Sequence, residues 1–253
     1  MTEFNYQLYS SRNHGPLGET LRMLAKAGYA GVEGYGALYA GLDDAALSRL
    51  RQELDGNRLN MPTGHFDLDM LEGDPDRSIK VARALGVRTV YGPFLPPDER
   101  PRDAEGWAAF GKRLNKIGQP ILDAGLAFGW HNHDFEFVTL ADGSRPIEHI
   151  FGAAPNLEWE ADIAWIARGG ADPDEWIDKY GDRITAVHVK DIAPKGENAD
   201  EDGWADVGHG TLAWKELMDR LRQTNAAYFI VEHDKPGDDE RFATRSIAAA
   251  RKF

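Results

Sequence analysis

The stretch WHNHDFEF, residues 130–137, places two histidines, an asparagine and two carboxylates within eight residues. Side chains of these types transfer protons as general acids and bases, and they bind divalent metal ions. Similar groups occur in WEAD (159–162), VHVKD (187–191) and VEHD (231–234), each time at the end of a largely apolar run. The sequence therefore indicates an acid–base or metal site assembled from the ends of several strands.

Strand alternation indicates which of these groups face the same way. Side chains on a strand point alternately to its two faces, and the apolar residues mark the face that packs against helices. Val187 and Val189 therefore direct His188 and Lys190 to the opposite, inward face. The same argument directs these further residues inward: His131, His133, Glu158, Glu160, Asp162 and Glu232. Glu136 falls on the other parity, and we expect the strand to end before it so that a loop returns its side chain inward.

An alternation of β-like runs and amphipathic helical segments supplies these strands. The β-like runs are 4–9, 31–35, 61–66, 88–94, 126–133, 157–162, 184–191 and 228–234. Between them, apolar residues recur at three- and four-residue spacing. Eight such units predict an α/β fold, a single (β/α)8 barrel domain over residues 1–253, with an open doubly wound sheet as the alternative. The polar segment 194–208 is long enough to act as a lid.

The composition of the chain argues against a nucleic acid or a membrane as its binding partner. The net charge of −13 would repel a phosphate backbone, so no nucleic-acid partner is expected. No apolar stretch approaches the length of a membrane span, and the N-terminus lacks the basic and apolar regions of a signal peptide. The chain has no cysteine, which excludes disulfides and thiolate metal ligands. We expect a cytoplasmic protein whose partner is a small molecule.

Five motifs resemble those of the xylose-isomerase-like barrel superfamily, the broad group of sugar phosphate isomerases and epimerases. They are WHNHDFEF, ADIAW followed by GGADP, AVHVKD, DVGHGTLAW and YFIVEHD, and the resemblance covers essentially the whole chain. The group includes ketohexose 3-epimerases, inosose dehydratases and enzymes that act on 3-keto-glycosides. The resemblance implies one divalent cation with four ligands: Glu136, Asp162, His188 and Glu232. His133 is close enough in sequence to replace Glu136 as a ligand.

Three carboxylates and one imidazole suit manganese, the expected ion, and also magnesium, cobalt or zinc. The DNA-repair branch of the superfamily binds several zinc ions and carries a further His three residues after the Asp. Here that position is Trp165, and the Asp-x-His pair expected later in the chain reads Asp202-Gly-Trp204. We therefore expect a single cation and no cleavage of DNA.

The chemistry implied by the resemblance is removal of a proton next to a sugar carbonyl, through a metal-stabilised enediolate. Glu136 and Glu232 would transfer the proton on opposite sides of the sugar in an isomerase or epimerase. Because a metal-bound carboxylate is a weaker base, His133 or Lys190 could take this role instead. Expulsion of a β-substituent from the same enolate would make the protein a lyase or hydratase. A sugar-binding barrel without catalytic activity is a third reading.

Further residues are expected to contact the substrate. His65 lies at the end of the third β-like run, and His131 and Glu33 face inward by alternation. Trp165 and Trp204 could stack on a sugar ring. The resemblance places His209 in the family's glycine turn, next to substrate. We expect an unphosphorylated keto-sugar or glycoside as substrate, and the family is compatible with a homo-oligomer.

Overall fold

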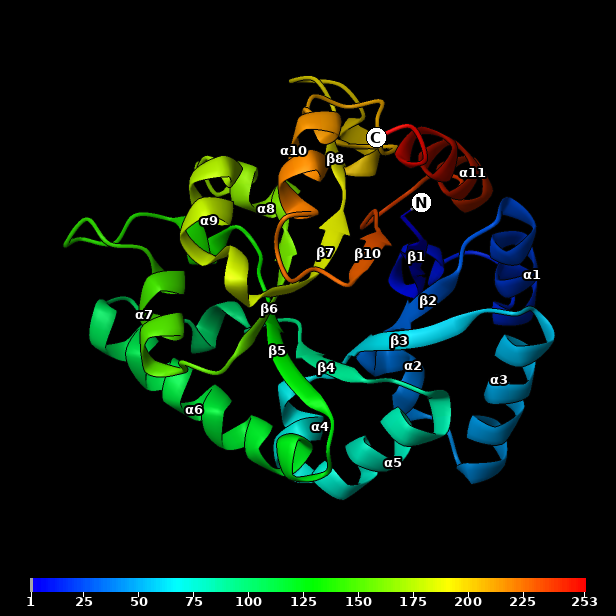
Figure 1. Ribbon diagram of the computed structural model, residues 1–253, viewed down its shortest axis with the longest axis horizontal. Coiled ribbons are helices and arrows are strands. Elements are labelled where there is room, and N and C mark those ends of the chain that lie inside the picture. The colour runs from blue at the N-terminus through cyan, green and yellow to red at the C-terminus, as the bar shows by residue number, and fades with distance from the viewer. Residues whose placement is uncertain (1) are drawn as a thin grey trace.

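The computed structural model describes residues 2–253, in which eight parallel strands close into a barrel (Figure 1). The strands follow one another around the barrel in the order β1-β10-β7-β6-β5-β4-β3-β2. Their bounds are β1 (Phe4–Gln7), β2 (Gly31–Gly34), β3 (Asn60–His65), β4 (Thr89–Gly92), β5 (Ala127–His131), β6 (Glu158–Asp162), β7 (Ile184–Val189) and β10 (Tyr228–Val231). The predicted barrel is confirmed, and the open sheet is excluded because β1 pairs with both β2 and β10.

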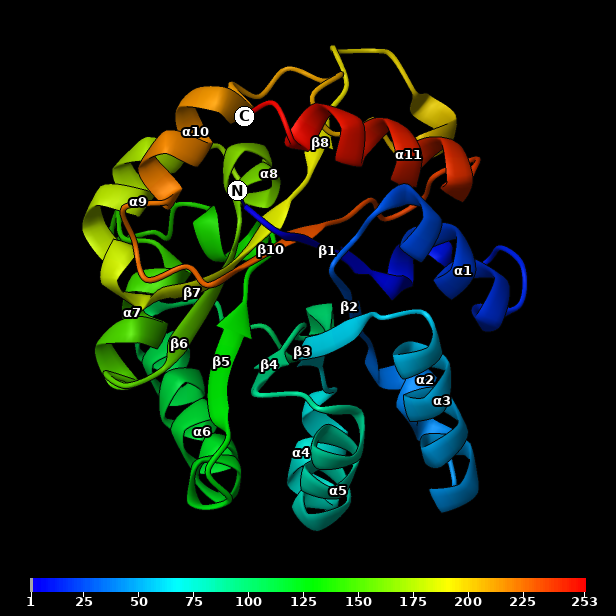
Figure 2. The same cartoon turned by 45° about the vertical axis from the view of Figure 1, so that its right-hand side comes forward.

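Helices follow the strands and surround the barrel (Figures 1 and 2). Their bounds are α1 (Leu17–Ala27), α2 (Gly36–Ala40), α3 (Asp44–Gly56), α4 (Leu68–Gly73), α5 (Pro75–Leu85), α6 (Ala104–Asp123), α7 (Pro146–Ala153), α8 (Ile163–Arg168), α9 (Pro173–Tyr180), α10 (Trp214–Leu221) and α11 (Asp239–Ala250). Several begin at an aspartate whose side chain accepts a hydrogen bond from the first turn, as Asp43 and Asp103 do. Gly28 ends α1 with a φ of 92°, a conformation that favours glycine.

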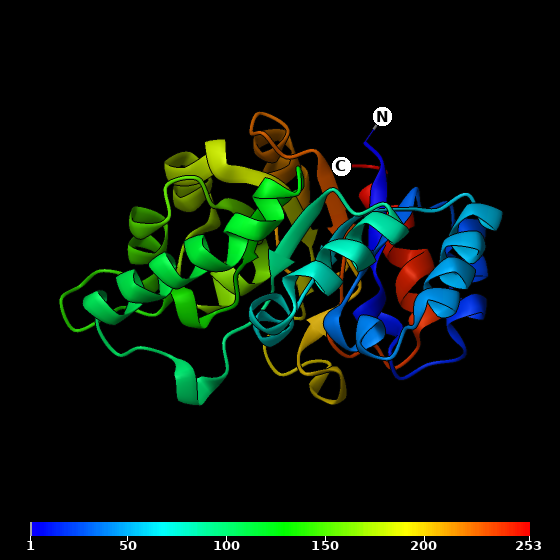
Figure 3. The same ribbon diagram turned by 90° about the horizontal axis from the view of Figure 1, so that it is seen from below.

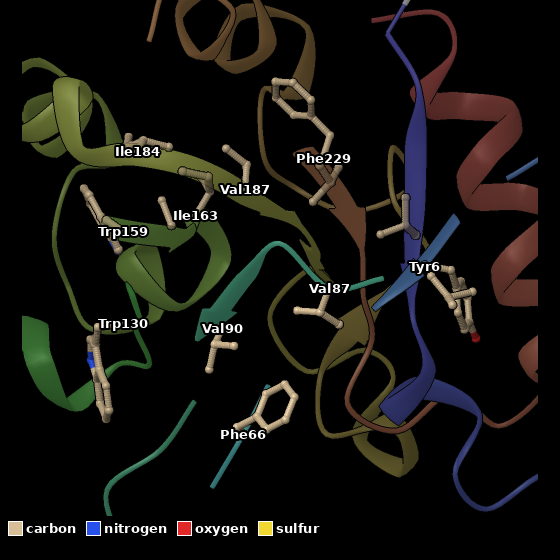
Figure 4. Close-up of a cluster of buried hydrophobic side chains, with 14 of the residues drawn as sticks. Tyr6, Phe66, Val87, Val90, Trp130, Trp159, Ile163, Ile184, Val187 and Phe229 are labelled. Carbon is tan, nitrogen blue, oxygen red and sulfur yellow. The ribbon is translucent and has the colours of Figure 1, made fainter. Parts of the chain in front are cut away.

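The main core lies between the barrel and its helices. Trp130, Trp159, Val187 and Phe229 are among its buried side chains (Figure 4), and each comes from the apolar face that alternation assigned to the helices. Tyr91, Ala186 and Ile230 form a second, smaller cluster. Beyond this small cluster, the inner face at the C-terminal ends of β5, β6 and β7 carries polar side chains: His131, Glu160, Asp162 and His188.

Strand register brings the polar residues to the same level of the barrel. Asp162 on β6 pairs with His188 on β7, and His131 on β5 pairs with Glu160 on β6. Val189 on β7 pairs with Val231, so Glu232 follows directly after the last paired residue of β10. These pairings place the C-terminal ends of four neighbouring strands side by side.

The polar segment after β7 contains a small two-stranded antiparallel sheet, β8 (Asp191–Ile192) and β9 (Trp204–Ala205). Asp191 fixes the following glycine turn, because its carboxylate accepts hydrogen bonds from the backbone N–H groups of Gly208, Gly210 and Leu212. Figure 3 shows the segment at the end of the barrel opposite both chain termini. Within residues 2–253, no helix combines the length and the apolar character needed to cross a membrane.

Candidate functional site

A cavity of about 560 Å³ opens at the C-terminal ends of the strands. Its polar and aromatic lining comes from the last residues of seven barrel strands and from the segments that follow them: Tyr9, Tyr35, His65, Asp67, Phe94, Arg100, His131, His133, Asp134, Phe135, Trp165, Glu232 and Asp234. This is the end of a (β/α)8 barrel at which active sites lie. The predicted site residues His65, His131, His133, Trp165 and Glu232 all line it.

Three predicted metal ligands meet beside this cavity, and one of them, Glu232, lines it. The donor atoms of Asp162, His188 and Glu232 lie within 4.8 Å of one another, and all three side chains are buried. His188 Nδ1 lies 3.0 Å from Glu232 Oε2 and 3.8 Å from Asp162 Oδ2. Two buried carboxylates beside an imidazole nitrogen are a donor set that suits a divalent cation.

The Asp162 side chain shows why a cation fits there. Its Oδ1 accepts a hydrogen bond from Trp165 N and so caps α8, whereas Oδ2 has no hydrogen-bond partner in the described part of the chain. Burial and the nearby negative charge of Glu232 raise the pKa of Asp162 to about 7, against the attraction of Lys190. A buried carboxylate oxygen without a partner is costly, and a bound cation would supply the missing interaction.

Lys190 lies behind this cluster and does not line the cavity. Its fully buried Nζ donates to Asp234 Oδ2 at 2.6 Å and to Glu232 Oε2 at 3.1 Å. Burial alone would lower the pKa of Lys190, but these two carboxylates raise it, so the side chain is an ammonium ion. The same positive charge and that of His188 outweigh burial and hold the pKa of Glu232 well below its usual range.

A second polar cluster occupies the barrel interior next to the first. Glu160 Oε2 lies 2.5 Å from His65 Nε2, 3.2 Å from His131 Nδ1 and 3.3 Å from His188 Nε2. These four residues could also hold a metal ion by proximity. Of the three contacts, the one between Glu160 Oε2 and His65 Nε2 is a hydrogen bond, and His131 Nδ1 has no hydrogen-bond partner in the described residues. Burial and the charge of Glu33 raise the pKa of Glu160 to about 7.

Glu33 connects the two clusters through His188. Glu33 Oε1 lies 2.8 Å from His188 Nε2 and accepts a hydrogen bond of 2.7 Å from Gln7 Nε2. His188 Nδ1 is thereby left to face Asp162 and Glu232. Alternation predicted an inward Glu33, but the structure places it below the cavity, where it contacts histidines and does not line the substrate space.

Glu136 does not join either cluster, which departs from the expected ligand set. It lies in the 3-10 helix η3 (Phe135–Phe137), where Oε1 accepts from Trp130 Nε1 at 2.8 Å and Oε2 accepts from His133 N at 2.9 Å. The Trp130 ring contacts Phe110 of α6, so the carboxylate lies in the layer between barrel and helices. Strand β5 ends at His131, and the turn after it carries Glu136 outward. We therefore omit Glu136 from the ligands and from the proton-transferring groups.

His133 remains at the cavity, whereas His209 does not. The His133 ring lies between Phe94, at 5.2 Å, and Trp165, also at 5.2 Å, and its buried Nδ1 has no partner in the described residues. Burial and the charge of Lys190 lower the pKa of His133 to about 3, so the ring is neutral. His209 is exposed on the glycine turn and is absent from the cavity lining, contrary to its expected contact with substrate.

The two tryptophans expected to stack on a sugar have different positions. Trp165 lines the cavity, but Trp204 is 1% exposed and packs against Trp165, with a ring-centroid separation of 4.7 Å. Three residues that take part in these clusters were not among the predicted site residues: Gln7, Glu160 and Asp234. Alternation already directed Glu160 inward, and Asp234 is the last residue of the motif YFIVEHD, which carries Glu232.

Comparisons with known proteins support the barrel fold. The sequence model of the family described as xylose isomerase-like TIM barrel matches residues 21–253. The rhizopine catabolism protein MocC of Rhizobium meliloti is 28% identical over 195 residues, which cover 70% of this chain and 58% of that protein. An inosose dehydratase of Clostridium botulinum is 31% identical over 93 residues, covering 36% of this chain and 30% of the dehydratase. The matches therefore span less than two thirds of either relative.

The fold is similar to that of a crystal structure of a sugar phosphate isomerase/epimerase from Parabacteroides distasonis. The two structures share a TM-score of 0.80 and 20% sequence identity, over 98% of this chain and 93% of the other. At this identity the likeness concerns the fold.

Proposed function

Because the chain belongs to the xylose isomerase-like TIM-barrel family, we propose that it is a metal-dependent isomerase or epimerase of a keto-sugar. The observation that carries the proposal is the meeting of Asp162, His188 and Glu232 at the side of a cavity large enough for a sugar. The family includes isomerases, epimerases and dehydratases, all of which act on small molecules.

One divalent cation, with manganese as the first candidate and magnesium, cobalt and zinc as others, would be held by Asp162, His188 and Glu232. When bound, it would act as a Lewis acid that stabilises the negative charge of an enediolate. The unpartnered Asp162 Oδ2 and the donor set support this assignment. The three protein ligands leave room for substrate oxygens to complete the coordination.

Two side chains, Glu232 and His133, could interact with the substrate from different sides of the cavity. Glu232 follows β10 and His133 follows β5, so β7 and β6 separate them in the barrel. On the β5 side, His133 Nδ1 has no hydrogen-bond partner in residues 2–253 and can accept a hydrogen bond from a sugar hydroxyl, whereas its pKa of about 3 makes the ring a weak base. Glu232 is ionised and can exchange a proton on the other side. Lys190 holds Glu232 in place and balances its charge.

A lyase or hydratase is the second candidate, and two observations favour it. The relatives include an inosose dehydratase. In addition, His131 and His133 both line the cavity, with ring centroids 5.1 Å apart, so imidazole N–H groups could donate hydrogen bonds to a leaving group. Both candidates share removal of a proton next to a carbonyl, and they differ in what the enolate does next.

Metal analysis and solvent exchange test the proposal together. We expect one equivalent of divalent metal per chain in the purified protein and none in an Asp162→Asn variant. Incubation with keto-sugars in deuterated water should incorporate deuterium without releasing water or an aglycone. Elimination would instead yield an unsaturated ketone that absorbs in the ultraviolet. A metal-free protein that catalyses neither exchange nor elimination would contradict the proposal and favour a sugar-binding barrel.

A further inference from the structure

Asn132, the asparagine of the WHNHDFEF stretch, belongs to neither polar cluster and does not line the cavity. It lies directly after β5, between His131 and His133, and its side chain is fully buried. A buried amide is normally bonded through both its oxygen and its nitrogen. The partners of this amide therefore indicate what it does.

The Asn132 amide bonds mainly to β6, the neighbouring strand. Its Oδ1 accepts hydrogen bonds from Trp159 Nε1 at 2.8 Å and from Asp162 N at 3.0 Å. Its Nδ2 donates to Asp162 O at 3.1 Å and, at 3.5 Å, to His133 O. One side chain thus binds both the N–H and the C=O of Asp162, the two groups that a paired strand would bind.

These bonds continue the contact between β5 and β6 beyond the end of β5. The two strands pair as far as His131 and Glu160. Asp162 lies two residues further along β6 and pairs with His188 of β7 on its other side. The Asn132 side chain replaces main-chain pairing at this point, so the main chain after β5 can leave the sheet while Asp162 stays fixed.

Asp162 is therefore held at its backbone and at one carboxylate oxygen. Asn132 binds the backbone N–H and C=O, and Oδ1 accepts from Trp165 N at 2.9 Å. The remaining oxygen, Oδ2, has no hydrogen-bond partner in residues 2–253 and lies 3.8 Å from His188 Nδ1. Metal ligands that neighbouring hydrogen bonds already hold in place lose little freedom when the ion binds.

From this geometry we propose that Asn132 is a positioning residue for the cation. Through the backbone of Asp162 it holds the free carboxylate oxygen beside His188 Nδ1, where the Asp162–His188–Glu232 cluster would bind the metal. This inference rests on the proposed function, since it concerns the same cation. It adds a residue that lies outside both the ligand set and the cavity lining.

Cobalt(II) is the probe for the test, because the visible absorption of bound Co2+ reports the geometry of its ligands. Asn132→Ala removes both hydrogen bonds to the Asp162 backbone. The partners of metal ligands typically contribute 10- to 100-fold in affinity, so we expect the Kd for Co2+ to rise about tenfold or more in a chelator competition assay. The absorption bands of bound Co2+ should also shift, a change that a loss of stability alone would not cause.

Trp159→Phe is the matched control. It removes the hydrogen bond from the indole to Asn132 Oδ1 but keeps both bonds between Asn132 and Asp162. Both variants remove a buried hydrogen bond, and both should lower the stability of the protein. Trp159→Phe should nevertheless leave the Kd for Co2+ within about twofold of the wild-type value and the absorption of bound Co2+ unchanged.

Hydrogen exchange tests the positioning role without any substitution. The Asp162 N–H should exchange slowly in the metal-free wild type, because its acceptor is the buried Asn132 amide and not a group that the metal brings. NMR of the wild type before and after treatment with a chelator measures this rate. Rapid exchange after chelation would show that the metal fixes Asp162, and it would overturn the inference. If Asn132→Ala does not fold, this measurement decides alone.

Unchanged Co2+ affinity or absorption in Asn132→Ala, or an equal loss of affinity in Trp159→Phe, would also overturn the positioning role. In these cases the wild type still binds Co2+, so the proposed function stands and only this inference is lost. A wild type that binds no Co2+ would instead contradict the proposed function.

Discussion

Buried carboxylates at the open end of this barrel occupy two kinds of surroundings. Glu136 accepts hydrogen bonds from two N–H groups and has no cationic partner at hydrogen-bonding distance, so burial raises its pKa to about 8. Glu232 is equally buried, yet Lys190 and His188 keep it ionised. Both carboxylates are buried, so the presence or absence of a cationic neighbour decides whether each one is ionised.

Glu136→Gln tests this difference through the pH dependence of stability. The folded-state pKa of about 8 lies above the usual 4.5. The contribution of Glu136 to the free energy of unfolding is therefore fully present below about pH 4.5 and is lost as the pH rises towards 8. Urea unfolding should show the wild type losing a few kcal/mol more than the variant between pH 5 and pH 8, as an order of magnitude. The variant should retain its metal, and equal losses would contradict the raised pKa.

Glu33 is the residue that we expect to orient His188. A carboxylate on the second nitrogen of a metal-binding histidine fixes the tautomer and typically improves metal affinity by 10- to 100-fold. Glu33→Gln keeps an acceptor for His188 Nε2 but removes the charge, so we expect metal affinity to fall about tenfold in a chelator competition assay. Glu158→Gln is the control, since this β6 carboxylate accepts from Thr185 and not from His188. Unchanged affinity in Glu33→Gln would argue against the orienting role.

Hydrophobic periodicity along the sequence predicted the positions of the strands and most of the side chains that face into the barrel. Each of the eight β-like runs contains its barrel strand, except that β3 begins one residue before its run, at Asn60. Alternation on β7 correctly directed His188 inward. Alternation also placed Glu136 on the outward parity, and the expectation that a loop returns its side chain inward is wrong, because the turn after β5 and a hydrogen bond from Trp130 Nε1 keep it outside the barrel. The contact of Glu160 with His65 joins residues 95 positions apart, and periodicity carries no information on such pairings.

Strand β5 owes its position partly to a glycine on α6. A Cβ at Gly118 would overlap the Phe128 ring of β5, whereas a Cβ at Gly152 of α7 would meet no atom within 4 Å. Gly118→Ala should therefore destabilise the protein by about 1–3 kcal/mol through overpacking, despite the better helix propensity of alanine. Gly152→Ala should be neutral or stabilising by up to about 1 kcal/mol. Urea unfolding of both variants measures the contrast, and similar effects would mean that α6 shifts freely against β5.

Across the whole molecule, negative charge extends from the surface into the barrel. The net charge is −13, and the barrel end holds Glu33 and Glu160 beside His188 and holds Asp162, Glu232 and Asp234 beside Lys190. Protonated histidines can balance part of this charge, and a divalent cation would balance more. Because β6, β7 and β10 are neighbours in the closed barrel, the same cation would also tie three strands together.

Removal of metal should therefore destabilise the entire barrel. Treatment with a chelator is expected to lower the Tm of the wild type, and added Mn2+ at about 100 times its Kd should restore about 2.7 kcal/mol of stability.

In the absence of metal, the Asp162→Asn variant should be more stable than the wild type. The substitution removes a buried carboxylate whose Oδ2 has no hydrogen-bond partner in the described residues. The Asn oxygen can still cap α8, as Asp162 Oδ1 does. Asp98→Asn, an exposed aspartate in the 3-10 helix η2 (Pro97–Glu99), should reproduce the wild-type response to Mn2+. Thermal unfolding of the wild type and of the two variants, with and without Mn2+, measures these differences. If neither the chelator nor Mn2+ changes the Tm of the wild type, protons alone balance the charge inside the barrel.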